Sequence, residues 1–533
     1  MIRSIRLGIA AWLVFAAAGA RHAVAQQPEF DVLIANGTVI DGSGGPRYRA
    51  DVALTGDRVA AISRVPIAPA RARRVIDATE KIVAPGFIDM HAHIEPLPQM
   101  PGAESAVRQG VTTALAASDG GSPMPLAPYL AERRQQGVGI NVGYMVGHNT
   151  ARQRVMGMAN RPPSAAELAQ MKALIAEGMA HGAFGMSTGL RYLPGNFART
   201  DEVIELSRVA ADSGGFYASH LREEGLGLFE GVGEAITIGR EARIPIVLTH
   251  HKAVGSRMWG ESRRTLAMID SARRSGIDVM ADVYPYTATS TGIGVLIPTW
   301  AFDGGDSAFT RRLGDPVLRD SIKRGIVFNI LHDRGGGDLA RVQFSRVRWQ
   351  PDLDGRTLAD WAKDRGLAPS PENGAELVIE AQQKGGASMI YHVLDEADVQ
   401  RIMQHPQVMI GSDGRLSSPG EGSPHPRAYG TFPRVLGRYT RELKLFSLET
   451  AIHKMTGLSA ARLRLTDRGL LRAGNFADVV VFDPATIADR STFETPHQYS
   501  VGIDYVFVNG VAAIDGGRFT DARSGRVLTR SRK

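Results

Sequence analysis

The chain has 533 residues, of which 43% are hydrophobic and 22% are charged, an ordinary balance for a soluble globular protein. Its net charge of +7 comes from scattered arginines and lysines without a long basic run, which disfavours a nucleic-acid partner. Cysteine is absent, so disulfides, thiolate zinc sites and iron–sulfur clusters are excluded, and a metal would have to bind His, Asp, Glu or Lys.

Residues 1–25 are typical of a secretory signal peptide. Arg3 and Arg6 precede an apolar run, and Ala23-Val24-Ala25 is a small-x-small cleavage site before Gln26. The apolar run is short for a membrane span, although an uncleaved anchor helix is the alternative. We therefore expect a secreted, periplasmic protein without membrane contact after cleavage.

Both ends of the mature chain have the pattern of short strands and tight turns. Residues 26–84 contain Asn36-Gly37 and Asp41-Gly42, and residues 468–533 contain the apolar runs Val479–Phe482 and Val506–Val508. We expect the two ends to meet in one small β-domain, a β-sandwich, around the long central region.

The central region, residues 85–467, alternates strand-like runs with helical stretches, one of which opens with the capping box Ser164-Ala165-Ala166-Glu167. This rhythm predicts an α/β fold, a (β/α)₈ TIM barrel whose active site lies at the C-terminal ends of the strands. The gap between Asp282 and Asp413 predicts an inserted subdomain at about 304–383, with one strand at Ile326–Ile330. The predicted barrel strands end near His93, Asp119, Gly147, Ser187, His220, His250, Asp282 and Asp413.

Metal-ligand residue types gather at these strand ends. His91 and His93 would share one face of a strand, because side chains alternate along a strand. Neutral imidazole is a good zinc ligand, and carboxylates complete such sites. A single buried histidine is more often a hydrogen-bonded core residue, but six candidates at one end of a barrel favour a metal centre. They are His91, His93, Asp119, His220, His250 and Asp413.

The motifs PGFIDMHAH, ASHLREEG, LTHHK, IGSDG and HPRAYGTFPR, in this order, resemble the amidohydrolase superfamily and, within it, the N-acyl-D-amino-acid deacylases (D-aminoacylases). The resemblance covers essentially the whole mature chain. It implies one metal position formed by His91, His93 and Asp413, and another formed by His220 and His250. Where the best-known D-aminoacylases have a cysteine, this chain has Asp119, which can ligate or bridge zinc but can change the number and identity of the metals.

The resemblance also implies roles around the metal. Asp413 would move the proton in amide hydrolysis, and Arg427 would clamp the carboxylate of the substrate. Further pocket residues implied are Lys252, Tyr284, Tyr192 and Ser290. Glu223 and Glu224 are interpreted as a solvated or supporting pair, and His251 as pointing away from the metal.

These features predict a zinc-dependent amidohydrolase, with one tightly bound Zn²⁺ and a possible second, that releases D-amino acids from N-acyl-D-amino acids. A D-specific dipeptidase or a cyclic-amide hydrolase is the alternative within the same enzyme class. An inactive scaffold or binding protein is the alternative outside it, and the complete set of candidate ligands disfavours that alternative.

Overall fold

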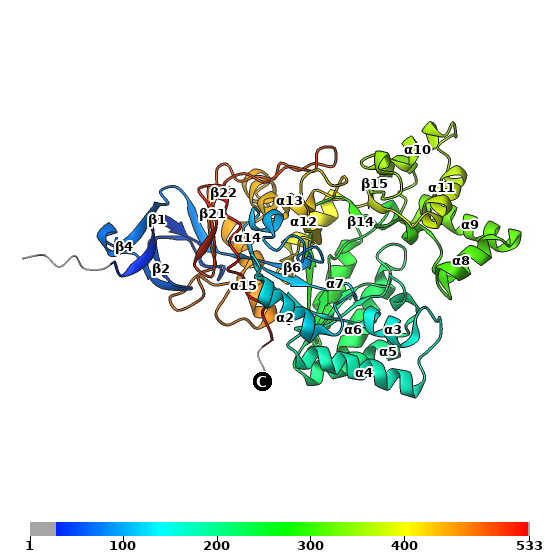
Figure 1. The fold of residues 1–533 in the computed structure, drawn as a ribbon, viewed down its shortest axis with the longest axis horizontal. Coiled ribbons are helices and arrows are strands. Elements are labelled where there is room, and N and C mark those ends of the chain that lie inside the picture. The colour runs from blue at the N-terminus through cyan, green and yellow to red at the C-terminus, as the bar shows by residue number, and fades with distance from the viewer. Residues whose placement is uncertain (1–27, 531–533) are drawn as a thin grey trace, which may run out of the picture.

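The computed structural model describes residues 28–530. The predicted signal peptide, residues 1–25, lies outside the described residues. Figure 1 shows three parts along the long axis: a β-domain where the blue and red ends of the chain meet, a central barrel, and a green-to-yellow subdomain at the far end. In the described part of the chain, no helix has the length and apolar character needed to cross a bilayer.

The central strands form a closed parallel ring. One sheet has the order β17-β13-β12-β11-β10-β9 and the other has the order β18-β6-β7-β8. The sheets join where β8 runs into β9 and β17 runs into β18, which leaves eight strand positions and confirms the predicted (β/α)₈ barrel. The strands are β6 (Phe87–His93), β7 (Val111–Ala116), β8 (Asn141–Tyr144), β9 (Val146–Gly147), β10 (Gly185–Gly189), β11 (Phe216–His220), β12 (Ile246–Leu248), β13 (Val279–Val283), β17 (Val408–Ile410) and β18 (Gly414–Arg415).

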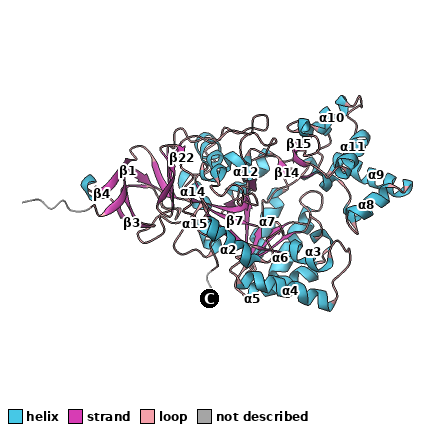
Figure 2. Ribbon diagram, viewed as in Figure 1, coloured by secondary structure: helices cyan, strands magenta, loops and turns pink. Residues whose placement is uncertain are grey.

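Helices cover the outside of the ring (Figure 2). The predicted capping box is confirmed: Ser164 accepts from the Glu167 backbone N–H, and the Glu167 side chain accepts from the Ser164 backbone N–H at the start of α4. The helices of this part are α1 (Glu104–Val107), α2 (Leu126–Gln136), α3 (His148–Met156), α4 (Ala165–Ala180), α5 (Thr200–Asp212), α6 (Leu228–Ala242), α7 (Ser262–Arg274), α12 (Glu396–Gln404), α13 (Arg427–Arg434), α14 (Leu448–Met455) and α15 (Gly457–Leu463).

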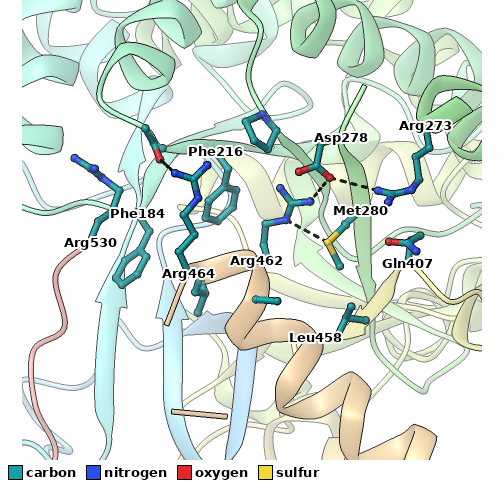
Figure 3. A pocket seen from close by; sticks show the side chains of 15 residues that line it. Phe184, Phe216, Arg273, Asp278, Met280, Gln407, Leu458, Arg462, Arg464 and Arg530 are labelled. Carbon is teal, nitrogen blue, oxygen red and sulfur yellow. Dashed lines mark hydrogen bonds and ion pairs between the residues drawn. The ribbon is translucent and has the colours of Figure 1, made fainter. Parts of the chain in front are cut away.

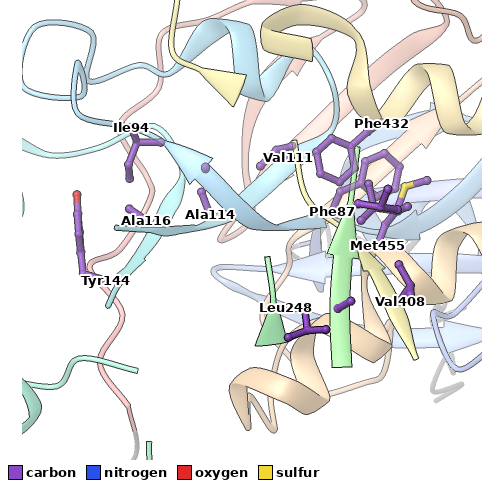
Figure 4. Close-up of a cluster of buried hydrophobic side chains, with 14 of the residues drawn as sticks. Phe87, Ile94, Val111, Ala114, Ala116, Tyr144, Leu248, Val408, Phe432 and Met455 are labelled. Atoms are coloured by element: carbon purple, nitrogen blue, oxygen red, sulfur yellow. The ribbon is translucent and has the colours of Figure 1, made fainter. Parts of the chain in front are cut away.

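Two apolar clusters hold the strands and helices together. The larger one lies between the ring and its helices, and Figure 4 shows Phe87 of β6 beside Phe432 of α13, with ring centroids 5.8 Å apart. The second cluster includes Met90, Met280 and Met409. Its other members lie in the remaining strands of the ring or directly beside them. Because it draws on all the strands, it fills the barrel interior, so the ring is a packed core that holds the strand ends rigidly.

Both chain ends enter one nine-stranded sheet of order β22-β21-β20-β19-β5-β1-β2-β3, with β4 paired to β1. The ends meet where β5 pairs antiparallel with β19. Apolar side chains such as Val52, Val83 and Val479 form its core. Its strands are β1 (Phe30–Val39), β2 (Tyr48–Thr55), β3 (Arg58–Ser63), β4 (Ala72–Asp77), β5 (Ile82–Pro85), β19 (Val479–Phe482), β20 (Ile503–Val508), β21 (Val511–Asp515) and β22 (Arg518–Phe519).

The inserted subdomain has its own three-stranded antiparallel sheet, β14-β16-β15, and its own core around Phe344 and Trp361. The predicted limits of 304–383 are too narrow, because β14 and β16 lie outside them and pair with β16 and β15 respectively. Its elements are β14 (Thr289–Gly292), α8 (Asp306–Leu313), α9 (Pro316–His332), β15 (Val342–Arg346), α10 (Leu358–Asp364), α11 (Pro371–Gln383) and β16 (Ser388–Tyr391).

The predicted strand Ile326–Ile330 is wrong, because these residues lie within helix α9. Asp315 caps that helix by accepting from the backbone N–H groups of Val317 and Leu318. Ile322, Ile326 and Ile330 are fully buried and recur every four residues, so they form one face of a helix. The run of β-branched and aromatic residues resembles a strand only when it is considered without its cap and its longer period.

Candidate metal centre

The six predicted ligands converge at the C-terminal mouth of the barrel in two groups. The first group is His91, His93, Asp119 and Asp413, and the second is Asp119, His220 and His250. Within each group, the ligand atoms lie within 4.8 Å of one another. Convergence follows from the topology, since the strands that carry these residues are parallel members of one closed ring.

Asp119 lies between the two groups. Its Oδ2 is 3.3 Å from His91 Nε2 and 3.4 Å from His93 Nε2, and its Oδ1 is 3.5 Å from His250 Nε2 and 3.7 Å from His220 Nδ1. One oxygen therefore faces each group. This is the geometry expected of a carboxylate that could serve both groups.

The chemistry of the donor set fits zinc. Asp119 Oδ1 is buried and has no hydrogen-bond partner among the described residues, so it is an acceptor without a donor. Burial lowers the pKa of His220 to about 3, which keeps this imidazole neutral, the form that binds metals. Burial also opposes protonation of His91, but the charges of Asp119 and Asp413 dominate and raise its pKa to about 10. The negative charges of these two carboxylates would be balanced by a bound cation.

Lys252 and Glu224 support the second group from behind. Lys252 Nζ lies 2.6 Å from Glu224 Oε1 and 2.6 Å from His250 Nδ1. Glu224 is 3% exposed, which agrees with the supporting role and excludes the solvated one, whereas Glu223 pairs with Arg191 at 2.9 Å. His251 Nε2 forms a hydrogen bond with the Thr265 hydroxyl, and His251 belongs to neither metal group, as predicted.

The two predicted tyrosines also line this region. The Tyr192 ring lies 4.4 Å from the His220 ring, centroid to centroid. The Tyr284 hydroxyl is buried and has no hydrogen-bond partner among the described residues. Burial raises the pKa of Tyr284 well above its ordinary value, so this hydroxyl stays protonated and can donate a hydrogen bond.

Arg427, at the start of α13, is buried beside Asp413, with Nη1 2.7 Å from Asp413 Oδ2. Its Nη2 makes only a long contact of 3.5 Å to the Ser290 carbonyl. The guanidinium stacks over the Tyr284 ring at 4.8 Å. A cavity of about 1260 Å³ connects these groups to the inserted subdomain and is lined by residues that include His93, Ser290, Asp413, Arg427, Trp349 and Lys384.

Arg334 is a charged residue beside this site that the sequence did not suggest. It is 4% exposed and its Nη1 lies 3.7 Å from Glu224 Oε2. It comes from the inserted subdomain, where no local pattern distinguishes it from the many other arginines of the chain. Only the docking of that subdomain against the barrel brings it here.

A second cavity lies at the opposite end of the barrel strands (Figure 3). There Arg273 and Arg462 both bind the Asp278 carboxylate, and the lining also includes the apolar side chains of Phe184 and Phe216. None of its lining residues belongs to either metal group. In barrels of this kind the N-terminal ends of the strands serve stability, so this cavity is not the candidate active site.

The geometry agrees with comparisons to known proteins. Residues 322–514 match the Amidohydrolase family. The D-aminoacylase of Alcaligenes xylosoxydans xylosoxydans is 40% identical over 526 residues, which cover 94% of this chain and 98% of that protein. The chain belongs to the D-aminoacylase family. The resemblance inferred from the motifs is thereby confirmed.

Solved structures of D-aminoacylase family members share the whole fold. A crystal structure of D-aminoacylase has a TM-score of 0.80 and 38% identity, with 94% of this chain and 100% of that chain covered. The N-acyl-D-glutamate deacylase of Bordetella bronchiseptica, solved with zinc and a phosphonate inhibitor that mimics the tetrahedral intermediate, has a TM-score of 0.79 and 35% identity over 94% of this chain and 100% of that one.

Proposed function

We propose that this protein is a zinc-dependent amidohydrolase that cleaves N-acyl-D-amino acids into a carboxylate and a free D-amino acid. The observation that carries the proposal is that His93 and Asp413 of the first metal group line one cavity together with the buried Arg427, while the second group adjoins the first through Asp119. His91, His93, Asp119 and Asp413 would hold one zinc ion, and Asp119, His220 and His250 would hold another. Bound zinc would lower the pKa of water to about 7 and polarise the amide carbonyl.

Asp413 would accept the proton of the attacking water and return it to the leaving amine. Burial alone raises the pKa of a carboxyl, but the charge of Arg427 and the nearby histidines outweigh it and hold the pKa of Asp413 well below its usual range. The carboxylate is therefore ionised at neutral pH, which is the state that a proton acceptor requires.

Arg427 would hold the carboxylate of the substrate. A guanidinium has five N–H donors, and here Nη1 pairs with Asp413 while Nη2 makes only the long contact to Ser290. A carboxylate could replace that contact without breaking the ion pair. The Tyr284 hydroxyl, which has no partner among the described residues, would donate a second hydrogen bond. Lys252, whose Nζ lies 5.6 Å from the centre of the Tyr284 ring, would add positive charge behind it.

The buried arginine also favours linear substrates over cyclic amides, which have no free carboxylate to bind. The test is amine release from matched N-acetyl-D-amino and N-acetyl-L-amino acids, D-dipeptides and cyclic amides, with and without added zinc. We expect release from N-acetyl-D-amino acids that chelation abolishes and zinc restores. Faster turnover of the cyclic amides, or equal turnover of both enantiomers, would contradict the proposal.

We also propose that the protein is exported and acts in the periplasm, on the basis of the N-terminal sequence. N-terminal sequencing of the periplasmic fraction should begin at or near Gln26. Exported material that retains Met1 would contradict cleavage at Ala25.

A further inference from the structure

Two metal-ligand residues have backbone conformations that non-glycine residues rarely adopt. His250, just beyond β12, has φ 37°, and Asp413, just beyond β17, has φ 49°. Both values lie in the left-handed region, where the side chain crowds the backbone. Such residues persist only where their surroundings hold them. Neighbouring groups must therefore hold the backbone of each of these two loops.

Asp89 of β6 ties down the loop that carries Asp413. It is 4% exposed. Its Oδ1 accepts from the backbone N–H of Ser412 at 2.8 Å and of His91 at 3.1 Å, and its Oδ2 accepts from the Ser412 hydroxyl. The Asp413 N–H in turn donates to the His91 carbonyl at 2.7 Å. One buried carboxylate thus fixes the backbone next to two ligands of the first metal group.

Asp282 of β13 has the corresponding place beside His250. It is 0% exposed, and its Oδ1 accepts from the His250 backbone N–H at 2.8 Å. The same oxygen lies 3.7 Å from His91 Nδ1. The packing around it is tight, since a Cβ atom added at Gly411 would lie 2.9 Å from Asp282 Oδ1. The backbone of Gly411 therefore packs closely against the Asp282 carboxylate.

Both carboxylates come from the strand next to the loop that they hold: β6 pairs with β18 beside Asp413, and β13 pairs with β12 beside His250. Neither carboxylate belongs to a metal group. We propose that Asp89 and Asp282 are positioning residues that set zinc affinity through these backbone hydrogen bonds. Asp89 acts on the group with Asp413, and Asp282 acts mainly on the group with His250. This inference concerns the metal centre and does not depend on the substrate.

The test compares Asp89→Ala and Asp282→Ala by zinc titration against a chelator of known affinity. His93→Ala and His220→Ala serve as references, because each lacks a ligand of one group only. We expect Asp89→Ala to weaken the same zinc position as His93→Ala. The loss of affinity should be about 10- to 100-fold, the range typical of groups that orient metal ligands. The Asp282→Ala titration should match that of His220→Ala.

The matched control is Asp398→Ala. Asp398 is also a buried carboxylate that accepts a backbone N–H, that of Gly260, and a serine hydroxyl, that of Ser262, but it lies outside both metal groups. Its loss should lower the Tm of the metal-free protein and leave both zinc affinities unchanged. Wild-type zinc affinities in Asp89→Ala and Asp282→Ala, or an equal loss in Asp398→Ala, would overturn the proposal.

Asparagine variants provide the rescue. Asn keeps the Oδ1 acceptor, so Asp89→Asn and Asp282→Asn should bind zinc within about three-fold of the wild-type affinity. If the alanine variants do not fold, the asparagine variants test the proposal. A ten-fold or greater loss of zinc affinity in either one would show that hydrogen bonding to the loop does not set the affinity. Because zinc is measured without substrate, this outcome is independent of the test of amide hydrolysis.

Discussion

At the scale of single residues, the site depends on where each charge is placed. Asp119 presents one oxygen to each metal group. Burial raises the pKa of this carboxyl, but the charges of His91 and His250 prevail and hold it well below its ordinary value. The residue is therefore an anion at neutral pH that lies between the two groups, and a side chain without a ligand atom at this position would leave each group one ligand short.

We expect Asp119→Ala to weaken both zinc positions together and to reduce amide hydrolysis by a factor on the order of a hundred or more. Elemental analysis and kinetics on the purified variant would measure the two effects. The control is Asp201→Ala, whose side chain is 72% exposed at the start of α5. Unchanged zinc content in Asp119→Ala would show that Asp119 is a turn residue and not a metal ligand.

Arg427 has two effects that can be measured separately. Arg427→Ala should raise KM for substrates with a free carboxylate but not for amidated ones. It should also raise the pKa of Asp413, because the lowering charge at 2.7 Å is lost. The acidic limb of the pH–rate profile would then move to higher pH, since Asp413 must be ionised to accept the proton.

Arg427→Lys is the matched variant for that measurement. It keeps the charge but loses the two-pronged geometry, so its acidic limb should move less while its KM still rises. If Arg427→Ala raised KM equally for free and amidated substrates, Arg427 would not be the residue that binds the substrate carboxylate.

At the scale of elements, the barrel strands are fixed by contacts that reach into the surrounding helices. Lys454 of α14 is 2% exposed and donates to the carbonyls of His405 and Val408. Val408 begins β17, the strand that leads to Asp413. A buried ammonium thus links a helix of the outer layer to a strand that carries a metal ligand.

Burial lowers the pKa of Lys454 to about 8. Between about pH 8 and 10.5 the unfolded chain binds this proton and the folded protein does not, so the folded state gains relative stability as pH rises. Compared with Lys454→Met, the wild-type protein should therefore gain up to about 3 kcal/mol across this range. Denaturant unfolding of both proteins at several pH values measures the difference. If the difference in unfolding free energy between the two proteins did not change with pH, the pKa of Lys454 would not be lowered.

At the scale of the whole molecule, the β-domain and the barrel share a buried polar network. Asp478 forms a buried ion pair with Arg468 and accepts from the Asn509 backbone N–H at 2.8 Å. Asn141 of β8 donates to Asp478 at 3.1 Å and accepts from Asn509 Nδ2 at 2.9 Å. The C-terminal segment is thereby joined to a barrel strand more than three hundred residues earlier in the chain.

We expect Asp478→Ala to reduce the free energy of unfolding by about 3 to 5 kcal/mol, because it leaves the Arg468 charge buried and unpaired. Thermal unfolding followed by both circular dichroism and fluorescence would measure this loss. The exposed pair of Arg324 and Asp320 offers a control, since Asp320→Ala should change stability by less than about 1 kcal/mol. Equal effects of the two substitutions would show that the network contributes nothing beyond a surface ion pair.

The barrel, the meeting of the two chain ends and the six candidate ligands could all be predicted from the amino-acid sequence alone. This is possible because these features follow from local periodicity and topology: an apolar run that ends on His220 or His250 is a strand, and parallel strands of one barrel bring their ends together. No contact between distant residues had to be known. The motif resemblance then identified the family from the same strand ends.

The remaining features depend on contacts that exist only in the folded chain. The segment at Ile326–Ile330 has the composition of a strand, and the packing of Ile322, Ile326 and Ile330 in the core of the insertion is what shows that they form one face of a helix. Glu224 lies beside Lys252 because the loops after two neighbouring barrel strands meet, and Arg334 lies beside Glu224 because the insertion docks against the barrel. Asp89 and Asp282 act through hydrogen bonds to neighbouring strands. Such contacts join residues far apart in the chain, and local propensity carries no information about them.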